Sequence, residues 1–544
     1  MASPNKHRSR LLIIGLDGAT YRVLDPLLEE GALPHLKSIM ERGTRGLLRS
    51  TIPTNSAAAW VSFMTGKNPG KHGVFEFQVR AKAGGPKMIA SSRSIHGETM
   101  FQILSRQGRR VVALNVPMTY PPQTVNGALV SGIPIPGSSR SWAYPESLVD
   151  ELDRAVDGYV IGVPWRDVLG NVNPFLEELT TMTRKRARAA RYLMERYDPD
   201  VAAVVFVGPD RLQHCLWQLL DPNHARYQER EAREHRGAIQ NYFFELDQAV
   251  GEVLAGVGEE TTVLVLSDHG FQAAEKQLSL NEWLAEEDLL RFRRAGLWSI
   301  IEPLRQMENP LVWRLRNWWH SNATGRLRTL TPKPGIDWAR TTAYAPWGFQ
   351  QGVSVNLAGR EVQGTVELGA DYEELRNRLQ AKLMALRDPE SGRPVVREVR
   401  FREECYRGPF LDMAADVVIV PEEGFSVSPP PRRHALFQST GWACGCHERD
   451  GILLAAGKGI RQGRFAPGAA IQDIAPTVLH LLGLPIPDDM DGRVLDELYT
   501  PEAGFGAPEY EATSGSDGAE MQDIYTDEES RDLEDKLRGL GYLG

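Results

Sequence analysis

Side chains that can bind metal ions stand at the ends of three predicted strands: Asp17, Asp210 and the pair Asp268-His269. The strands are the apolar runs 11–16, 201–207 and 261–266. In an open α/β sheet, ligands bind at the edge where the parallel strands end, so we expect the three carboxylates to converge in one crevice. A single Asp after a strand is often a turn residue or a helix cap. Three of them, two with a histidine close by, favour a metal site.

Two further histidines complete the predicted ligand set. His214 lies four residues after Asp210, so the two side chains share one face of a helix. His447 comes just before a later predicted strand over residues 451–455. Mixed aspartate and histidine ligands suit Zn²⁺, and Mn²⁺ is the alternative because oxygen atoms make up about half of the set.

A hydroxyl group, that of Ser56, is predicted at the start of a helix that runs towards Thr65. Backbone N–H groups there have no partner within the helix and the helix dipole adds positive charge, so a phosphoryl group in front of Ser56 would be stabilised. Ser56 or Asn55 could also be a simple N-cap. The metal site favours catalysis, because a nearby divalent cation lowers the pKa of a serine hydroxyl and makes it a nucleophile.

The order of these motifs resembles the alkaline phosphatase superfamily, and within it the type I phosphodiesterase/nucleotide pyrophosphatase family. Asp17 follows the first strand, and Ser56 lies in a P-T-x-[ST] segment before a T-G-x-x-P-x-x-H-G run. PDxxxH, SDHG and a late Gly-x-His follow. The resemblance covers residues 10–275 and 410–495. It implies an α/β fold, a three-layer αβα sandwich with a mostly parallel central sheet and an inserted cap region.

The resemblance also implies a role for each site residue and a small-molecule phosphoester as substrate. It makes Ser56 the nucleophile of a metal-dependent phosphoric ester hydrolase that forms a covalent phosphoseryl intermediate. Two divalent metal ions, zinc or else manganese, are implied, and such a pair can hold the attacking and leaving oxygens of a phosphoryl transfer. One ion would be bound by Asp17, Ser56, Asp268 and His269, and the other by Asp210, His214 and His447.

Three other functions stay open at this stage: a phosphomonoesterase, a phosphoglycerate-mutase-like phosphotransferase, and a non-catalytic, metal-stabilised binding protein. Nucleotide pyrophosphatases carry an asparagine three positions after the nucleophile, which binds a non-bridging phosphoryl oxygen. In this chain Ala59 stands at that position, so Asn55, the N–H groups of the helix or a residue of the cap must bind this oxygen. Tyr120 and Trp347 are further candidates for substrate binding. No arginine stands beside Ser56 in the sequence, which favours diesters, and the sequence around Ser56 disfavours a sulfatase.

Strands and helices alternate along most of the chain, which indicates a parallel sheet covered on both faces. We expect one long helix over residues 21–42, an irregular excursion over 135–175, and a strand at 415–420 that rejoins the central sheet. The expected regions are the catalytic domain (8–277 and 401–498), an inserted cap rich in Trp and Arg (278–400), and an acidic tail (499–544). The tail is predicted to be disordered apart from a terminal helix over 528–540.

Composition narrows the possible partners and the compartment. The formal charge of −9 resides in residues 501–544, which hold twelve acidic and three basic residues, so the rest is balanced and no binding of long nucleic acid is expected. Arginines interleaved with tryptophans in the cap can contact membranes or bases, but a packed cap core with solvated arginines is the commoner arrangement. Apolar runs are too short for a signal peptide or a transmembrane segment, and four cysteines form no disulfide framework, so we expect a cytoplasmic protein.

Overall fold

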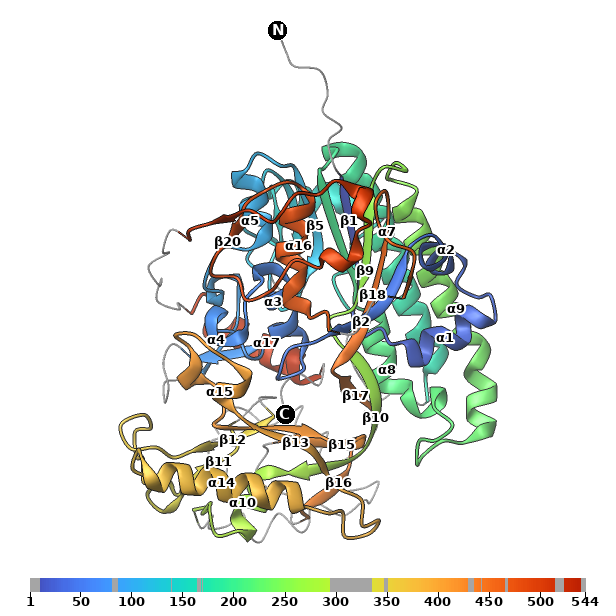
Figure 1. Cartoon of the computed structure of the whole chain (residues 1–544). Coiled ribbons are helices and arrows are strands. Elements are labelled where there is room, and N and C mark those ends of the chain that lie inside the picture. Colours follow the sequence, from blue (N-terminus) through green and yellow to red (C-terminus); the bar gives the residue numbers. More distant parts are fainter. Residues whose placement is uncertain are drawn as a thin grey trace.

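Nine strands form the central sheet of this computed structural model (Figure 1). Neighbouring strands from β9 to β6 pair in parallel, whereas β18 and β7 run antiparallel to the strands beside them. The strands that deliver the aspartates, β9, β1 and β8, are adjacent, so their carboxyl ends meet in the middle of the sheet edge. The order is β19 (Gly463–Arg464), β2 (Thr44–Arg49), β18 (Asp450–Ala456), β9 (Thr262–Leu266), β1 (Leu11–Leu16), β8 (Val201–Phe206), β5 (Val111–Val116), β6 (Gly127–Ser131) and β7 (Ala143–Tyr144).

The structure describes residues 10–80, 87–137, 139–163, 168, 170–293, 335–346, 351–428, 435–441, 443–464, 468–513 and 523–539. Trp347 and most of the predicted Trp/Arg-rich part of the cap lie outside these ranges. Within them, no helix combines the length and the apolar character that a membrane span needs.

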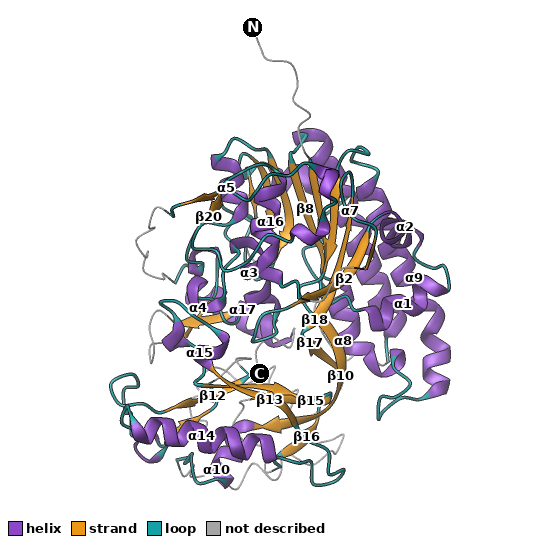
Figure 2. Ribbon diagram, in the orientation of Figure 1, coloured by secondary structure: helices purple, strands orange, loops and turns teal. Residues whose placement is uncertain are grey.

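Helices cover both faces of the central sheet (Figure 2). One face carries α3 (Ser56–Thr65), α5 (Met100–Arg106) and α16 (Ile474–Leu481). The other face carries α1 (Tyr21–Glu29), α2 (Pro34–Arg42), α7 (Val172–Tyr197), α8 (Gly208–Leu220) and α9 (Glu229–Leu254). The predicted three-layer αβα architecture with a mostly parallel sheet is therefore confirmed.

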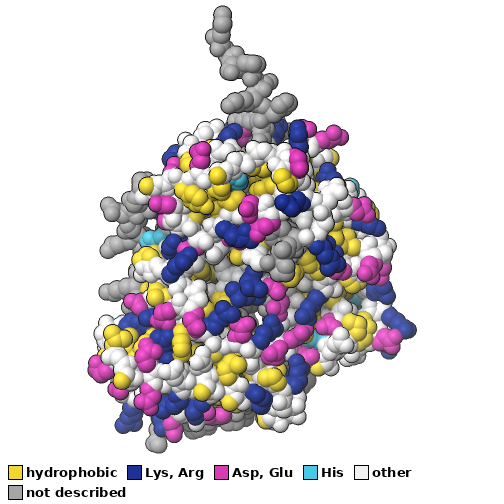
Figure 3. Space-filling view, viewed as in Figure 1, with side chains coloured by type: hydrophobic (Ala, Val, Ile, Leu, Met, Phe, Trp, Pro, Cys, Tyr) yellow, Lys and Arg dark blue, Asp and Glu magenta, His cyan; other side chains and the backbone are white. Residues whose placement is uncertain are grey.

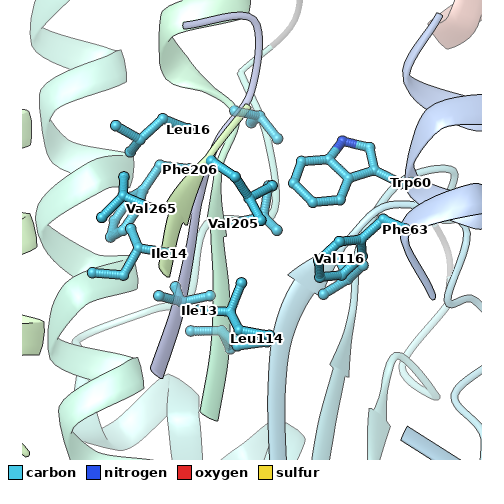
Figure 4. Close-up of a cluster of buried hydrophobic side chains, with 14 of the residues drawn as sticks. Ile13, Ile14, Leu16, Trp60, Phe63, Leu114, Val116, Val205, Phe206 and Val265 are labelled. Carbon is cyan, nitrogen blue, oxygen red and sulfur yellow. The ribbon is translucent and has the colours of Figure 1, made fainter. Parts of the chain in front are cut away.

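The core of this domain joins the sheet to the helix that begins at Ser56 (Figure 4). Every residue of β1, β5 and β8 is buried, as expected for strands with helices on both faces. Trp60 of α3 packs over Gly15 of β1, where a Cβ atom would stand 2.5 Å from the indole Cη2. Glycine at this position admits the indole ring, and the ring sets the distance between α3 and the end of β1.

A second, smaller unit, called the cap from here on, extends from the central domain along the long strand β10 (Gly270–Ser279) and includes Asp416 and β14, beyond the expected range 278–400. One of its sheets contains β11 (Ala343–Tyr344), β12 (Gly352–Val355), β14 (Val417–Pro421) and β13 (Val396–Phe401), and the other contains β15 (Gly424–Ser428), β10, β16 (Phe437–Ser439) and β17 (Gly445–Glu448). Helices α10 (Leu280–Glu286) and α14 (Ala370–Ala385) pack on them around a separate hydrophobic cluster. Strand β14 does not rejoin the central sheet as predicted from the sequence, because Val417 and Ile419 are buried in this cluster and Val418 in a smaller one beside it.

The predicted long helix over residues 21–42 is two helices, α1 and α2. Gly31 adopts a φ of +74° between them, and Pro34 begins α2, so the helix cannot continue through this segment.

Shorter elements complete the chain: α4 (Pro69–His72), β3 (Gln78–Arg80), β4 (Lys87–Ile89), α6 (Leu148–Ala155), α15 (Arg402–Cys405), β20 (Ile486–Pro487) and β21 (Tyr510–Glu511).

The acidic tail is attached to the central domain over its described residues. Its terminal helix, α17 (Asp527–Gly539), contacts β4, and Leu533 and Leu537 on this helix are buried. Tyr525 stacks on Tyr120 with ring centroids 6.1 Å apart. Helix α17 lies where the sequence predicted a terminal helix over residues 528–540, and its buried apolar face attaches it to the domain. On the face shown in Figure 3, acidic and basic side chains are interspersed.

Candidate metal centre and nucleophile

All seven residues predicted from the sequence as nucleophile or metal ligands lie close together in the structure. Asp17 follows β1, Asp210 and His214 lie on the first turns of α8, and Asp268-His269 follow β9. Ser56 is the first residue of α3, and His447 lies on β17, which pairs with β10. The central strand order places the three aspartates, and the helix and β17 bring in the serine and the last histidine.

The first group of ligand atoms surrounds the hydroxyl of Ser56. Its Oγ lies 3.5 Å from Asp17 Oδ1 and 3.3 Å from His269 Nε2. His269 Nε2 is in turn 3.7 Å from Asp17 Oδ1 and 3.4 Å from Asp268 Oδ2. Ligand atoms bound to one tetrahedral zinc ion at about 2.0 Å are about 3.3 Å apart, so this group has the spacing of a metal shell.

The second group has the same spacing. Nε2 of His214 lies 3.2 Å, and Nε2 of His447 lies 3.3 Å, from Asp210 Oδ1. The two Nε2 atoms are 2.9 Å apart. The groups adjoin, because the rings of His269 and His447 stack with centroids 3.6 Å apart.

Backbone carbonyl groups fix the orientation of the three imidazole rings. Nδ1 of His214 is 2.9 Å from the Gly445 oxygen, Nδ1 of His269 is 3.0 Å from the Gly270 oxygen, and Nδ1 of His447 is 3.0 Å from the Thr54 oxygen. A carbonyl oxygen only accepts hydrogen bonds, so each Nδ1 carries the hydrogen. In the neutral ring each Nε2 then directs a lone pair into the site, as a metal ligand must.

The titration of the buried groups fits a cation at their centre. Burial, followed by the charges of Asp268 and Asp210, raises the pKa of Asp17 well above its usual value, while the charge of Arg211 acts in the opposite direction. Burial and the charge of Asp210 raise the pKa of Asp268 to about 7. Burial lowers the pKa of His214 to about 4, which keeps that ring neutral. Mutually repelling carboxylates beside neutral imidazoles are the donor set that a divalent cation would stabilise.

Neighbouring groups that the sequence reasoning missed hold these ligands in place. Trp60 Nε1 donates a hydrogen bond of 3.2 Å to Asp17 Oδ2, and the Gly18 N–H donates one of 3.2 Å to Asp268 Oδ1. Gly18 has a φ of +68°, which favours glycine. Arg211, next to Asp210, is buried 3.5 Å from it. Gly18 and Arg211 directly follow predicted ligands in the sequence, and that adjacency is the signal that could have found them.

The three candidate substrate contacts have different positions. Asn55 caps α3: its Oδ1 accepts from the Ala58 N–H, and its Nδ2 donates to the Phe75 oxygen. Tyr120 is buried against the tail. Trp347 lies outside the described residues. Asn55 therefore already contributes to holding the first turn of the nucleophile helix.

The model of one protein family matches most of the chain. Type I phosphodiesterase / nucleotide pyrophosphatase matches residues 11–443. The chain belongs to this family. His447 lies beyond the matched segment, so the geometry, and not the match, places it in the centre of this phosphodiesterase-family protein.

Solved structures share the fold of this family member. Phosphonoacetate hydrolase from Sinorhizobium meliloti 1021 superposes with TM-scores of 0.54 (phosphonoacetate complex) and 0.51 (phosphonoformate complex) at 17% identity. Both alignments cover 88% of this chain and 95% of the hydrolase. A 2,3-bisphosphoglycerate-independent phosphoglycerate mutase from Laribacter hongkongensis (strain HLHK9) is 58% identical over 40 residues, which are 7% of this chain and 8% of the mutase.

Proposed function

We propose that this protein is a metal-dependent phosphoric ester hydrolase of the phosphodiesterase/nucleotide pyrophosphatase type, with Ser56 as a covalent nucleophile. Family membership supports the reaction class. The observation that carries the proposal is the convergence of two groups that could hold a metal ion, Asp17, Asp268 and His269 in one and Asp210, His269 and His447 in the other. The Ser56 hydroxyl lies 3.3 Å from His269 and 3.5 Å from Asp17.

Two divalent cations fit these residues, and zinc suits the mixture of imidazole and carboxylate. Asp17, Ser56, Asp268 and His269 would hold one, and Asp210, His214 and His447 the other. When bound, the cations would supply positive charge to the phosphoryl oxygens and to the attacking and leaving oxygens.

The chain itself supplies the nucleophile and its position. Ser56 Oγ forms a bond to phosphorus while the bond to the leaving oxygen breaks, and the serine proton leaves with the alcohol product. A water molecule then breaks the Ser56–phosphorus bond, which restores the serine hydroxyl and releases the phosphate product. The Asn55 cap and the Trp60–Gly15 contact fix the first turn of α3, so the hydroxyl needs little reorganisation before attack.

Replacement of the nucleophile tests the proposal. We expect Ser56→Ala to abolish turnover of bis-p-nitrophenyl phosphate while the metal content, measured by mass spectrometry, stays close to that of the wild type. Ser62→Ala on the same helix is the matched control: it removes a hydrogen bond to His72 Nε2 of 2.9 Å but no group of the centre, so turnover should persist. Undiminished turnover by Ser56→Ala would overturn the nucleophile assignment.

A phosphotransferase is the second candidate, and the short match to a phosphoglycerate mutase favours it. The covalent intermediate would be the same, but an acceptor hydroxyl would replace water in the second step. Product analysis in the presence of an alcohol acceptor separates the two functions. Transfer that greatly exceeds hydrolysis would favour the transferase.

A further inference from the structure

The C-terminal segment 523–539 is packed against the catalytic domain. Figure 1 shows its helix, α17, at the end of the central sheet that faces the cap. Leu533 and Leu537 on this helix are buried, and so is Tyr525, which precedes it. All three belong to the main hydrophobic cluster of the domain. An acidic segment that buries an apolar face is a packed part of the domain, and its detachment would expose that face to water.

The tail contacts loops that follow two strands of the central sheet. Tyr525 stacks on Tyr120, and Asp532 Oδ2 accepts a hydrogen bond of 2.9 Å from the Gly137 N–H. Tyr120 lies in the loop after β5, and Gly137 lies in the loop after β6. Strand β6 pairs in parallel with β5, and β5 with β8, the strand that precedes Asp210. The tail therefore lies at the same edge of the sheet as the candidate metal centre.

The tail also packs on the hairpin that β3 and β4 form. Helix α17 contacts β4, and Val79 of β3 and Ile89 of β4 lie in the same hydrophobic cluster as the leucines of the tail. Directly after the hairpin, the Ser92 N–H donates to the Tyr120 oxygen at 2.7 Å, and Ser92 Oγ donates to the Pro121 oxygen at 2.6 Å. The tail, the hairpin and the loop after β5 therefore support one another.

The same hairpin is connected to the start of the nucleophile helix. The Asn55 side chain, which caps α3, donates from Nδ2 to the Phe75 oxygen at 2.8 Å. Phe75 lies just before β3, and the Ala90 N–H donates to the Phe77 oxygen at 2.9 Å, next to the paired residues of the hairpin. Because Asn55 directly precedes Ser56, a shift of the hairpin would be transmitted to the first turn of α3.

We propose that the C-terminal segment 523–539 is a positioning element of the catalytic site. By holding the β3–β4 hairpin and the loop after β5, it fixes the Phe75 carbonyl group and, through Asn55, the hydroxyl of Ser56. The inference rests on the proposed function and adds a requirement for the tail. The candidate metal ligands lie on or directly after β1, α8, β9 and β17, so the tail should affect the rate of turnover and not the binding of metal ions.

Detachment of the tail in the full-length protein tests this role. Leu533→Asp/Leu537→Asp places two carboxylates in an apolar contact, which disfavours the docking of α17. We expect kcat for bis-p-nitrophenyl phosphate to fall on the order of 10- to 100-fold, because a small displacement of a reacting group is enough for such a loss. KM should change little, and the metal content, measured by mass spectrometry, should not change. Arg531→Ala, at an exposed position of the same helix, is the matched control and should keep the wild-type kcat.

Tyr525 allows a milder change that leaves both leucines in place. Tyr525→Ala removes the ring that stacks on Tyr120, and we expect kcat to fall by about tenfold. Tyr525→Phe keeps the ring and loses only a buried hydroxyl for which the described residues provide no hydrogen-bond partner, so kcat should match that of the wild type. Equal kcat values for the two variants would count against positioning by the stacked ring.

The connection through Asn55 makes a separate prediction. Asn55→Ser keeps a hydroxyl that can cap α3 but removes the amide that donates to Phe75. If the tail acts through this amide, its detachment should lower kcat much less in the Asn55→Ser protein than in the wild type, since the effects of coupled residues do not add. Full additivity of the two losses would overturn the inference.

Hydrogen–deuterium exchange provides a readout that does not need turnover. In Leu533→Asp/Leu537→Asp the amides of residues 74–80 and 87–92 should exchange faster than in the wild type, whereas those of β1 and β9 should stay protected. Wild-type kcat in a variant whose α17 amides exchange freely would overturn the inference. Loss of bound metal together with turnover would also overturn it, because the tail would then support the whole domain.

One result separates this inference from the proposed function. Persistent turnover by Ser56→Ala would overturn the proposed nucleophile alone. The exchange of the hairpin amides and the kcat values of the tail variants would still decide the role of the tail.

Discussion

The catalytic centre and the cap both bury aspartates, but the groups that surround the buried carboxylates differ. In the cap, Arg360 binds both oxygens of Asp416, with Nη1 2.7 Å from Oδ1 and Nη2 2.6 Å from Oδ2. The Tyr372 hydroxyl and the Val355 N–H each add a hydrogen bond of 2.7 Å. Although burial favours the neutral acid, these contacts hold the pKa of Asp416 below its usual value.

In the catalytic centre the carboxylates lie close to one another and to three imidazole Nε2 atoms. The pKa values of Asp17 and Asp268 are raised there by burial and by the neighbouring carboxylates. Burial acts on Asp210 in the same direction, but His214, His447 and Arg211 hold the pKa of this carboxyl well below its usual value. A buried carboxylate with a complete set of donors contributes to folding, whereas a cluster that lacks such donors is arranged for a cation and for chemistry. The same residue type therefore has a structural role in one region and a functional role in the other.

The largest loss of activity should follow from removal of a negative charge in the catalytic centre. Asp210→Asn keeps the size of the side chain but removes the carboxylate of the second ligand group. We expect turnover to fall on the order of a thousandfold, since metal-based stabilisation is worth several kcal/mol. Mass spectrometry of the purified variant should find one metal ion fewer per chain. Full metal content with normal turnover would place Asp210 outside the centre.

The corresponding change in the cap should affect stability and not metal binding. Asp416→Asn removes the bidentate partner of the buried Arg360, which keeps Glu361 at 3.5 Å. We therefore expect the free energy of unfolding of the cap to fall by about 3 kcal/mol, the lower end of the cost of breaking a buried ion pair. Urea denaturation measures this loss. Asp25→Asn, which removes the exposed partner of Arg45, is the matched control and should cost less than about 1 kcal/mol. Loss of metal from Asp416→Asn would contradict the separation of the two regions.

Asp268 in the catalytic centre and Asp416 in the cap should respond to pH with opposite signs. Because the pKa of Asp268 is raised to about 7, the metal-free folded protein holds a proton there that the unfolded chain releases near pH 4. This contribution to stability is present at low pH and is lost as the pH rises towards 7. Asp416, with its lowered pKa, contributes stability at neutral pH that is lost in acid.

Thermal unfolding with and without zinc measures this difference. Zinc competes with the proton on Asp268, so the increase in Tm that zinc causes should be larger at pH 7.5 than at pH 5.5. Asp268→Asn should remove much of this pH dependence. Equal zinc stabilisation at both pH values in the wild type would argue against Asp268 as a ligand.

The smallest effect is expected for a neighbour of a ligand. Trp60→Phe keeps an aromatic ring over Gly15 but removes the hydrogen bond from Nε1 to Asp17 Oδ2. Loss of a group that orients a metal ligand typically weakens metal affinity about 10- to 100-fold, and we expect the lower end because Asp17 keeps its position directly after β1. Calorimetric titration with zinc measures this affinity. An unchanged zinc affinity would mean that Trp60 contributes only packing.

The fold of the catalytic domain was largely predictable because its three adjacent strands β9, β1 and β8 are short, continuous apolar runs, each followed by an aspartate. Val417–Pro421 is just as apolar, yet it pairs in the cap. A strand buried on both faces carries no local mark of the sheet to which it belongs. The terminal helix was predicted from the sequence, but the burial of Leu533 and Leu537 on it was not, because it depends on a surface that distant segments form.

By itself the sequence determined which residues could form the centre, because Asp17, Asp210, His214, Asp268 and His269 occupy positions fixed by local strand and helix periodicity. Only the tertiary structure decided the distances among them, the approach of His447 from β17 and the placement of Arg211 beside the carboxylates. Local spacing along one strand or helix sets the direction of a side chain, whereas the meeting of side chains from distant segments depends on strand order and packing.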